Sequence, residues 1–431
     1  MGKGDAGWFV HDRFGMFIHW GLYALPARHE WVKHREEIPD EKYDIYFKHF
    51  NPDLFDPAQW AKTARQAGMK YVVITTKHHE GFCLWDSAYT DYKATNTPAK
   101  RDLIKEFVDA FRAEGLKIGF YYSLIDWHHP HFTIDSLHPL RNHPEREKLN
   151  SSRDMNKYRE YLHNQVREIL THYGKIDILW CDFSYPADKN RPEGWVGKGR
   201  QDWDSENLVK MVRSIQPHIL INNRLDLENE WDFLTPEQID VPEGLTVDGK
   251  PVVWESCHTF SGSWGYHRDE ATWKSVDVLI RMLIDTVSKG GNLLLNVGPT
   301  ARGEFDSRAM ERLAGIGEWM KRHSRSIYGC TKAPEEFSAP KDCRLTYNPE
   351  TNRLYVHIFA WPYVFLPIKG FEDRIEYAQL LHDGSEVFVK KIDYPIVRTK
   401  KAENKITMTS FILPVVKPDV CVPVIEVFLK K

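Results

Sequence analysis

The sequence predicts an α/β protein with a (β/α)8-like (TIM) barrel over residues 1–332 and a C-terminal antiparallel β-sandwich over residues 333–431. Short apolar runs alternate with amphipathic helical patterns seven or eight times in the first 330 residues, which is typical of such a barrel. The runs are rich in β-branched and aromatic residues throughout, as strands buried on both faces require. From about Ala333 the chain changes to short alternating runs separated by Asn, Pro and Gly, which indicates antiparallel strands.

The individual elements follow from apolar runs and from helix start and stop signals. Asp56 and Pro57 precede one helical pattern and Gly68 follows it, which is the usual order of an N-cap, a first-turn proline and a C-terminal glycine. The predicted helices are 56–68, 102–114, 154–173, 208–215, 276–287 and 310–322. The predicted strands are 15–18, 71–76, 117–123, 176–182, 218–224, 252–256 and 292–299, with residues 235–237 in a polar loop between the fifth and sixth strands.

Polar side chains gather where the predicted strands end. Those at the carboxyl ends are His19, His78, His79, Tyr121, Asp182, Arg224 and Glu255, and Glu30 and Glu237 lie in adjoining loops. In a barrel all these ends converge on one mouth, so residues far apart in sequence can meet there. Phe82 and Trp85 follow the histidine pair closely, and an apolar wall beside hydrogen-bonding groups suits a sugar pocket. Two adjacent histidines in a loop are otherwise more often simply solvated.

Composition excludes several classes of partner. There are 58 basic and 61 acidic residues, a formal charge of −3 and no polybasic block, so neither nucleic acid nor a membrane surface is an expected partner. The start has no apolar h-region, and no later run approaches the roughly 18 apolar residues of a membrane span. We therefore expect a cytoplasmic protein, although a secreted form trimmed of its signal peptide would look the same. Six cysteines without a CxxC pair disfavour zinc ribbons and a disulfide framework. The sequence leaves a homo-oligomer open.

The chemistry suggested by these residues is glycoside hydrolysis. Signatures of acyl, phosphoryl and hydride transfer are absent from the sequence. Glycosidases use two carboxylates that flank the scissile bond. Asp182 is the best candidate for the nucleophile, because it follows an apolar strand beside Trp180 and a carboxylate buried there without a partner is costly. A helix cap is the alternative role for Asp182.

Seven segments carry a resemblance to a known family. FGMFIHWGLYALPARHEW, TTKHHEGFCLWDSAYTDY, RDLIKEF, GFYYS, LWCD, SWGY and GGNLLLNVGPTARGEF resemble, in the same order, segments of the α-L-fucosidases of glycoside hydrolase family 29. The likeness covers about residues 8–330. It implies a (β/α)8-like barrel with a C-terminal β-sandwich and no metal or cofactor. It also implies release of fucose from fucosylated oligosaccharides or glycoconjugates, with retention, through a covalent glycosyl-enzyme.

The resemblance also implies roles for individual residues. Asp182 corresponds to the nucleophile, and Trp264 to part of the wall near the sugar. The acid/base is Glu237 by first choice and Glu255 by second. The residues matching those that hold the fucose hydroxyls and ring are His19, Glu30, Trp31, His78, His79, Tyr121 and Arg224. The family commonly has Asp where this chain has Glu80, and Asp where it has Asn223, and both changes are expected to affect sugar preference.

Three alternatives stay open at this point. One is a metal-dependent barrel hydrolase with His78, His79 and Asp182 as ligands, although adjacent histidines seldom bind one metal together. Another is a non-catalytic sugar-binding barrel, and the third is a glycosidase for a related pyranose with an axial hydroxyl. The sequence does not determine the linkage that is cleaved.

Overall fold

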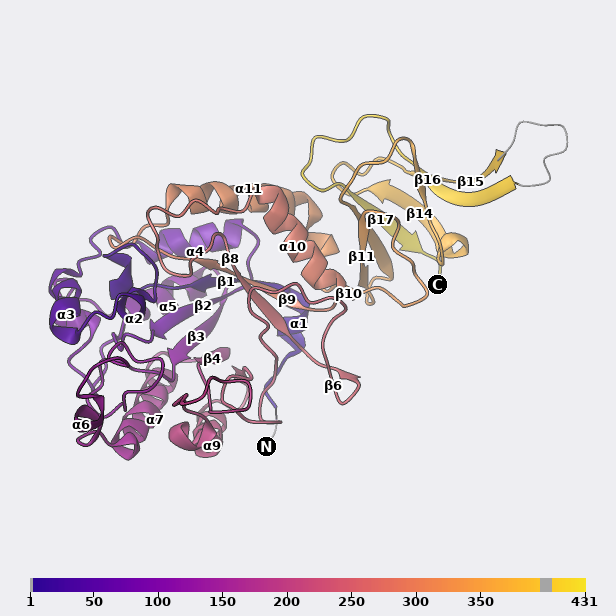
Figure 1. Ribbon diagram of the computed structural model, residues 1–431. Helices are drawn as coiled ribbons and strands as arrows, with labels where there is room; N and C mark the ends of the chain where they lie inside the picture. Colours follow the sequence, from indigo (N-terminus) through magenta and orange to yellow (C-terminus); the bar gives the residue numbers. More distant parts are fainter. Residues whose placement is uncertain (1–2, 396–404) are drawn as a thin grey trace.

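The computed structural model describes residues 3–395 and 405–431, so residues 1–2 of the predicted N-terminal start and 396–404 of the predicted β-sandwich lie outside the described residues. Figure 1 shows a larger α/β part, which runs from indigo to orange along the chain, and a smaller yellow β part beside it. The C-terminal sheets, one of which includes β10 (Thr331–Lys332), lie beside the barrel next to α10 (Val276–Ser288).

The centre of the larger part is a parallel sheet that curls round on itself. Within the described ranges its seven strands run in the order β5-β4-β3-β2-β1-β9-β8. The register places Met16 opposite Val72 on one side and Leu295 on the other. The strands are β1 (Phe14–Ile18), β2 (Tyr71–Lys77), β3 (Lys117–Ser123), β4 (Ile178–Asp182), β5 (Leu220–Ile221), β8 (Glu255–Thr259) and β9 (Asn292–Val297).

Residues 232–238, here called the closing segment, fill the gap between β5 and β8. The amide of Asp232 donates to the carbonyl of Ile221 at 2.8 Å, and the amides of Glu255 and Cys257 donate to Leu234 and Pro236 at 2.9 and 3.1 Å. Parallel bridges accompany these bonds on both sides. Residues 235–237 belong to no helix or strand, as the prediction of a loop requires, but the isolated bridges of the closing segment make this loop part of the barrel wall. The (β/α)8-like fold class itself is confirmed.

Helices cover the outside of the sheet, and several begin at the predicted caps. The Asp56 side chain accepts from the amide of Gln59 at 3.0 Å, and Asp102 accepts from Lys105 at 2.9 Å. The helices are α1 (Gly7–Asp12), α2 (Val32–Arg35), α3 (Asp40–His49), α4 (Pro57–Gln66), α5 (Leu103–Ala113), α6 (Arg146–Asn150), α7 (Met155–His172), α8 (Arg200–Trp203), α9 (Ser205–Ile215), α10 and α11 (Ser307–His323). Short 3-10 turns are η1 (Leu22–Ala24), η2 (Ala94–Asn96), η3 (Ser324–Ser326) and η4 (Glu372–Arg374), and β6 (Thr246–Val247) pairs with β7 (Lys250–Pro251) in a small hairpin.

The strand side chains alternate between two cores. Met16 and Ile18 of β1 pack outward in the large cluster between sheet and helices, whereas Phe17 points into the barrel. The interior cluster also contains Tyr121 and Trp180, whose rings stack with centroids 5.7 Å apart. Aromatic residues thus pack inside the barrel below its carboxyl-terminal mouth, and they form the floor on which the site is built.

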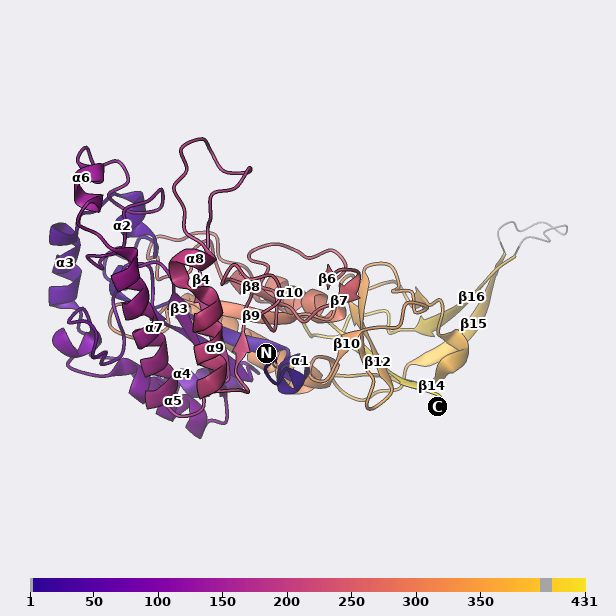
Figure 2. The same cartoon turned by 90° about the horizontal axis from the view of Figure 1, so that it is seen from below.

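The C-terminal part consists of two antiparallel sheets with an apolar core between them. One has the order β10-β11-β12-β17-β14 and the other β13-β16-β15. The strands are β11 (Cys343–Asn348), β12 (Arg353–Ile358), β13 (Phe365–Pro367), β14 (Ile375–Leu380), β15 (Phe388–Pro395), β16 (Lys405–Ile412) and β17 (Val424–Leu429). Figure 2 shows β15 and β16 extending away from the barrel. The indole of Trp319 on α11 donates to the carbonyl of Val422 at 2.9 Å and so joins the two parts.

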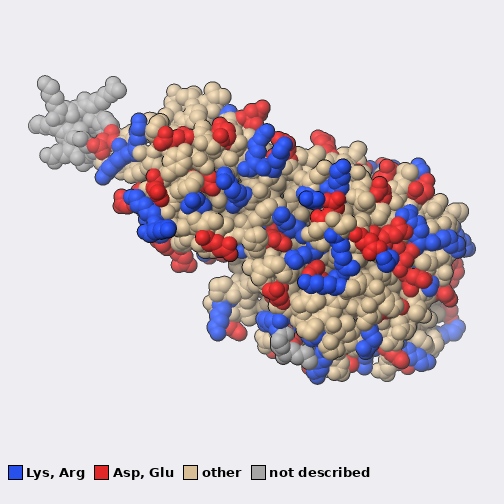
Figure 3. All heavy atoms as spheres, turned by 180° about the vertical axis from the view of Figure 1, so that it is seen from behind, with Lys and Arg blue, Asp and Glu red and all other residues tan. Residues whose placement is uncertain are grey.

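Charges are mixed over the molecular surface. On the face shown in Figure 3, Lys and Arg side chains are interspersed with Asp and Glu. In the part of the chain that the structure describes, the helices are all too short or too polar to cross a lipid bilayer.

Candidate active site

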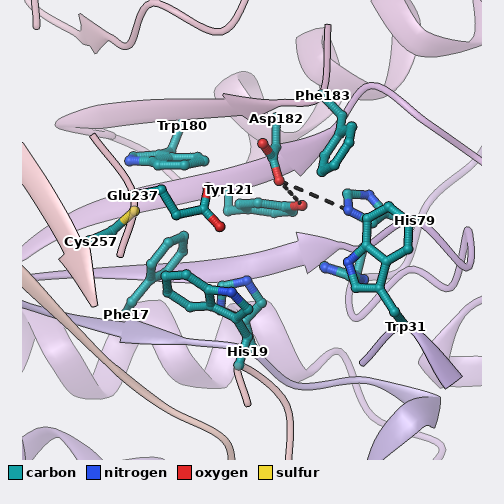
Figure 4. Close-up of a pocket in the computed structure, with 12 residues that line it drawn as sticks. Phe17, His19, Trp31, His79, Tyr121, Trp180, Asp182, Phe183, Glu237 and Cys257 are labelled. Carbon is teal, nitrogen blue, oxygen red and sulfur yellow. Dashed lines mark hydrogen bonds and ion pairs between the residues drawn. The ribbon is translucent and has the colours of Figure 1, made fainter. Parts of the chain in front are cut away.

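Asp182 is the last residue of β4, at the mouth of the barrel. The hydroxyl of Tyr121 on the adjacent strand β3 donates to its Oδ2 at 2.8 Å, and Arg224 Nη1 donates to its Oδ1 at 2.9 Å. Burial raises the pKa of the Asp182 carboxyl to about 6; Arg224 opposes that rise and the charge of Glu237 adds to it. Both oxygens of the carboxylate thus have donors. Figure 4 shows that the carboxylate still faces the pocket. It is therefore ionised and oriented at neutral pH.

Arg224, just beyond β5, connects the two candidate catalytic carboxyl groups. While Nη1 contacts Asp182, Nη2 donates to Glu237 Oε2 at 2.7 Å. Its Nε donates to Thr235 Oγ1 at 3.0 Å, and the guanidinium lies 4.7 Å from the centre of the Trp180 indole. Burial alone would lower the pKa of Arg224, but the two carboxylates raise it, so the guanidinium stays charged. One side chain thus fixes the relative positions of Asp182 and Glu237.

Glu237 lies on the closing segment, across the pocket from β4. Its backbone is paired with Cys257 of β8, and its side chain is 40% exposed. Figure 4 shows its carboxyl group, like that of Asp182, directed into the space beside Tyr121. Two carboxyl groups therefore face one pocket from opposite supports, as glycoside hydrolysis requires.

Three histidines from two strands line the same pocket. His19 follows β1, and His78 and His79 follow β2. His79 Nε2 lies 4.0 Å from Asp182 Oδ2. Burial lowers the pKa of His19 to about 3, and burial together with neighbouring charges lowers the pKa of His78 and His79 well below the ordinary value. All three imidazoles are therefore neutral at neutral pH.

The walls of the pocket are largely aromatic. The residues that line it besides the polar groups are Phe17, Trp31, Trp180, Phe183, Cys257 and Trp264. Sequence reasoning predicted Trp31 and Trp264 but did not propose Phe17, Trp180, Phe183 or Cys257 as site residues. Phe17 could have been found, because strand alternation places it on the same face as His19. Phe183 could not, because it follows Asp182 with φ at +77°, a conformation uncommon for a bulky residue.

Glu255 does not lie where the sequence placed it. The strand predicted at 252–256 is found at Glu255–Thr259, so Glu255 begins β8 instead of ending it. Its two oxygens accept from the Tyr71 hydroxyl at 2.6 Å and the Trp180 indole at 3.2 Å inside the barrel. Burial raises its pKa to about 7. The structure therefore supports Glu237, not Glu255, as the partner of Asp182.

Two further carboxyl groups, those of Glu30 and Glu80, do not line the pocket but hold the loops around it. Glu30 is buried, and its Oε2 accepts from the amides of Trp264 and Gly265 at 3.1 and 2.9 Å, which holds the Trp264 wall. Glu80, where the family commonly has Asp, accepts from the Leu22 amide at 3.0 Å and from the Tyr43 hydroxyl. Burial raises the pKa of each carboxyl to about 7. Both residues position loops that carry pocket side chains.

The other departure from the family pattern, Asn223, also acts on a loop. Its Oδ1 accepts from the amide and the hydroxyl of Thr235 at 3.0 and 2.9 Å. It therefore fixes the closing segment close to Glu237. No group of three or more His, Cys, Asp or Glu in residues 3–395 and 405–431 is arranged to hold a metal ion.

A barrel whose mouth holds a buried carboxylate, a second carboxyl group and neutral hydrogen-bonding groups between aromatic walls defines a glycoside hydrolase. The family model described as Alpha-L-fucosidase matches residues 4–325. The chain belongs to this α-L-fucosidase family.

Similar proteins agree with this assignment. The human plasma alpha-L-fucosidase is 31% identical over 386 residues, covering 82% of this chain and 76% of that protein. Alpha-L-fucosidase isoenzyme 1 from Paenibacillus thiaminolyticus is 46% identical, with a TM-score of 0.89 over 99% of both chains. A Bacteroides thetaiotaomicron GH29 alpha-L-fucosidase is 29% identical, with a TM-score of 0.82 over 100% of this chain and 98% of that one. Its structure is a covalent intermediate, trapped with 2-fluoro-fucosyl fluoride in a Glu-to-Gln mutant.

Proposed function

We propose that this protein hydrolyses terminal α-L-fucosides of oligosaccharides or glycoconjugates with retention, using Asp182 as nucleophile and Glu237 as acid/base. The observation that carries the proposal is the guanidinium of Arg224, which binds Asp182 at 2.9 Å and Glu237 at 2.7 Å. Retaining glycosidases keep their two carboxyl groups close together, whereas inverting enzymes leave room for a water molecule. Two carboxyl groups on one guanidinium fit the first arrangement.

The reaction takes two steps. In the first, an Asp182 oxygen forms a bond to the anomeric carbon while the bond from that carbon to the leaving oxygen breaks, and Glu237 gives its proton to that oxygen. In the second, Glu237 takes a proton from water, the water oxygen bonds to the anomeric carbon, and the bond to Asp182 breaks. Two inversions return the sugar to its original configuration.

The surrounding residues assist each step. Tyr121 and Arg224 hold the Asp182 carboxylate and must loosen one contact as its negative charge disappears into the glycosyl bond. The neutral histidines and the tryptophan walls hold the sugar ring. The exposure of Glu237 to solvent lets it exchange protons with water between turnovers.

The test is chemical rescue. Asp182→Gly should abolish turnover of an aryl α-L-fucoside, and added azide should restore release of the aryl group with β-fucosyl azide as product. Proton NMR of the wild-type reaction should show α-L-fucose as the first product. A fully active Asp182→Gly variant, or β-L-fucose as the first wild-type product, would overturn the proposal. Wild-type enzyme with azide serves as control, since it should form no β-fucosyl azide.

A further inference from the structure

The first histidine of the pocket is held through a buried amide. His19 Nδ1 lies 2.7 Å from Asn296 Oδ1, and Asn296 Nδ2 donates to the carbonyl of Trp264 at 2.6 Å. A backbone carbonyl can only accept, so it fixes which end of the amide faces His19. The amide oxygen faces the imidazole and can only accept as well. The proton of neutral His19 therefore sits on Nδ1.

A second histidine, His79, is held in the same way, but through a hydroxyl group. His79 Nδ1 lies 2.7 Å from Ser123 Oγ, and Ser123 Oγ donates to the carbonyl of Ile125 at 2.8 Å. Because the single serine proton is directed at that carbonyl, Oγ presents a lone pair to His79. The proton of neutral His79 is therefore also on Nδ1. Ser123 is fully buried at the end of β3, so no solvent competes for this bond.

The opposite nitrogen of each ring faces the pocket without a protein partner. Among the described residues, His19 Nε2 has no hydrogen bond, and His79 Nε2 is 4.0 Å from Asp182 Oδ2, which is too far for one. His78 differs, because its Nδ1 is buried with no partner in the described part of the chain. Its tautomer is therefore free to adapt, and it provides an internal comparison.

We propose that Ser123 and Asn296 are positioning residues that lock His79 and His19 as Nδ1–H tautomers, so that both Nε2 atoms accept hydrogen bonds from sugar hydroxyls. This inference rests on the proposed function. It makes the pocket specific for a ring with two hydroxyls that donate toward these nitrogens. A deoxy, fluoro or methoxy substituent at either position cannot donate and is discriminated against, whereas a hydroxyl is accepted. The low pKa of His19 and the lowered pKa of His79 keep both nitrogens able to accept at working pH.

The tautomers can be observed directly without any substrate. Long-range ¹H–¹⁵N NMR of the ¹⁵N-histidine-labelled full chain separates protonated from non-protonated ring nitrogens. His19→Gln and His79→Gln identify the two sets of signals. We expect both rings to show a protonated Nδ1 and a non-protonated Nε2, and the His79 signals to move toward a mixture in Ser123→Ala. A protonated Nε2 on either ring of the wild-type protein would overturn the proposal, whether or not the protein hydrolyses fucosides.

Kinetics with modified sugars test the consequence. Ser123→Ala should raise KM for an aryl α-L-fucoside about tenfold, the loss expected for one hydrogen bond, with a smaller change in kcat. In the wild type, removing the hydroxyl that donates to His79 should raise KM by a similar factor. In Ser123→Ala the same removal should cost clearly less, because that bond is already weakened. An equal cost in both enzymes would overturn the assignment of Ser123.

A matched serine controls for damage to the fold. Ser326 is equally buried, and its hydroxyl also donates to a backbone carbonyl, that of His323, at 2.7 Å. It lies in η3, outside the pocket, and holds no imidazole. Ser326→Ala should therefore leave KM, and the cost of each deoxy substitution, as in the wild type. If Ser326→Ala raises KM as much as Ser123→Ala does, loss of packing explains both effects. Ser123 then has no positioning role toward His79.

Discussion

Arg224 and Asp182 are joined at 2.9 Å between Nη1 and Oδ1, across the mouth of the barrel. The contact links the ends of two adjacent strands. The charge of Arg224 is the largest of the effects that oppose the rise in the pKa of Asp182. Several measurable consequences follow from it.

The first concerns the shape of the guanidinium. Arg224→Lys keeps the charge but cannot reach both Asp182 and Glu237 with two fixed donors. Loss of one charge-assisted hydrogen bond costs about 1.5–3 kcal/mol, so kcat/KM on an aryl α-L-fucoside should fall by roughly 10–100-fold. Arg302→Lys, at a surface pair with Asp53, is the control and should have no effect. An unchanged kcat/KM in Arg224→Lys would contradict the bridging role.

The second concerns pH. Asp182 must be ionised to attack, and its pKa is raised to about 6, so kcat/KM should decline as pH falls below about 6. Arg224→Met removes the charge that opposes this rise, and the acid limb should therefore move to higher pH. The measurement is a pH profile of kcat/KM for both enzymes. An acid limb that stays in place, or moves to lower pH, would show that the limb does not report Asp182.

The third separates the two candidate acids. Glu237→Gln should lower kcat/KM by about 10²–10⁴-fold for fucosides with poor leaving groups, and by less when the leaving group needs no proton. Glu255→Gln should remain active, because Gln can still bond to Tyr71 and Trp180 inside the barrel. Assaying both variants with a series of aryl fucosides decides between them. If instead Glu255→Gln shows the leaving-group dependence, the assignment of Glu237 is wrong.

Glu255 also predicts a pH effect on stability. Its pKa is raised from 4.5 to about 7 in the folded protein, so between these values the folded state binds more protons than the unfolded state. Glu255 is fully stabilising below pH 4.5, and its contribution declines as pH rises to about 7. Glu255→Gln should remove that decline, by about 3 kcal/mol at most, in urea unfolding measured at pH 5 and pH 8. Equal pH dependence in both proteins would count against a buried neutral Glu255.

The buried ion pair of Lys77, which precedes His78, with Asp126 provides a further prediction. Lys77 Nζ lies 3.2 Å from Asp126 Oδ2, both side chains are almost completely buried, and the Asp126 Oδ1 accepts from the amides of His128 and His129. Asp126→Asn leaves Lys77 without its counter-charge and should destabilise the protein by about 3–5 kcal/mol in urea unfolding.

The exposed pair of Lys105 and Asp109 is the matched control for this ion pair. Asp109→Asn should cost less than about 1 kcal/mol, because solvent screens the charges. A loss in Asp126→Asn no larger than that in Asp109→Asn would mean that the buried lysine is neutral or finds another partner.

Much of the site could be predicted because the end of each continuous apolar run in the sequence marks the end of a strand. His19, His78, His79 and Asp182 each come at or directly after such a strand, and the structure brings them to one mouth. The shared mouth follows from parallel topology alone. The cytoplasmic location, the assembly state and the absence of nucleic-acid and membrane partners stay predictions.

The errors came from the irregular side of the barrel. Val252 to Trp254 are apolar and were predicted as strand, but the ladder begins at Glu255, so this carboxyl was assigned to the wrong end. The extended segment around Pro236 could not be predicted, because it contains a proline and polar residues. Its bridges are to residues that only the folded barrel brings next to it. Hydrogen bonds such as those of Ser123 and Asn296 leave no trace in hydrophobic periodicity.

The backbones that carry the two reacting carboxyl groups differ in how fully they are hydrogen-bonded. Asp182 ends a strand with hydrogen-bonded neighbours on both sides, whereas Glu237 follows a proline, which cannot donate a backbone hydrogen bond, in the closing segment. Substitutions at the exposed residues 238–240, which follow Glu237, therefore disturb the strand that carries Asp182 less than changes at the buried Asp232, Phe233 and Thr235 would. Directed evolution toward new leaving groups, or toward transfer to alcohols in place of water, has its most forgiving starting point at residues 238–240.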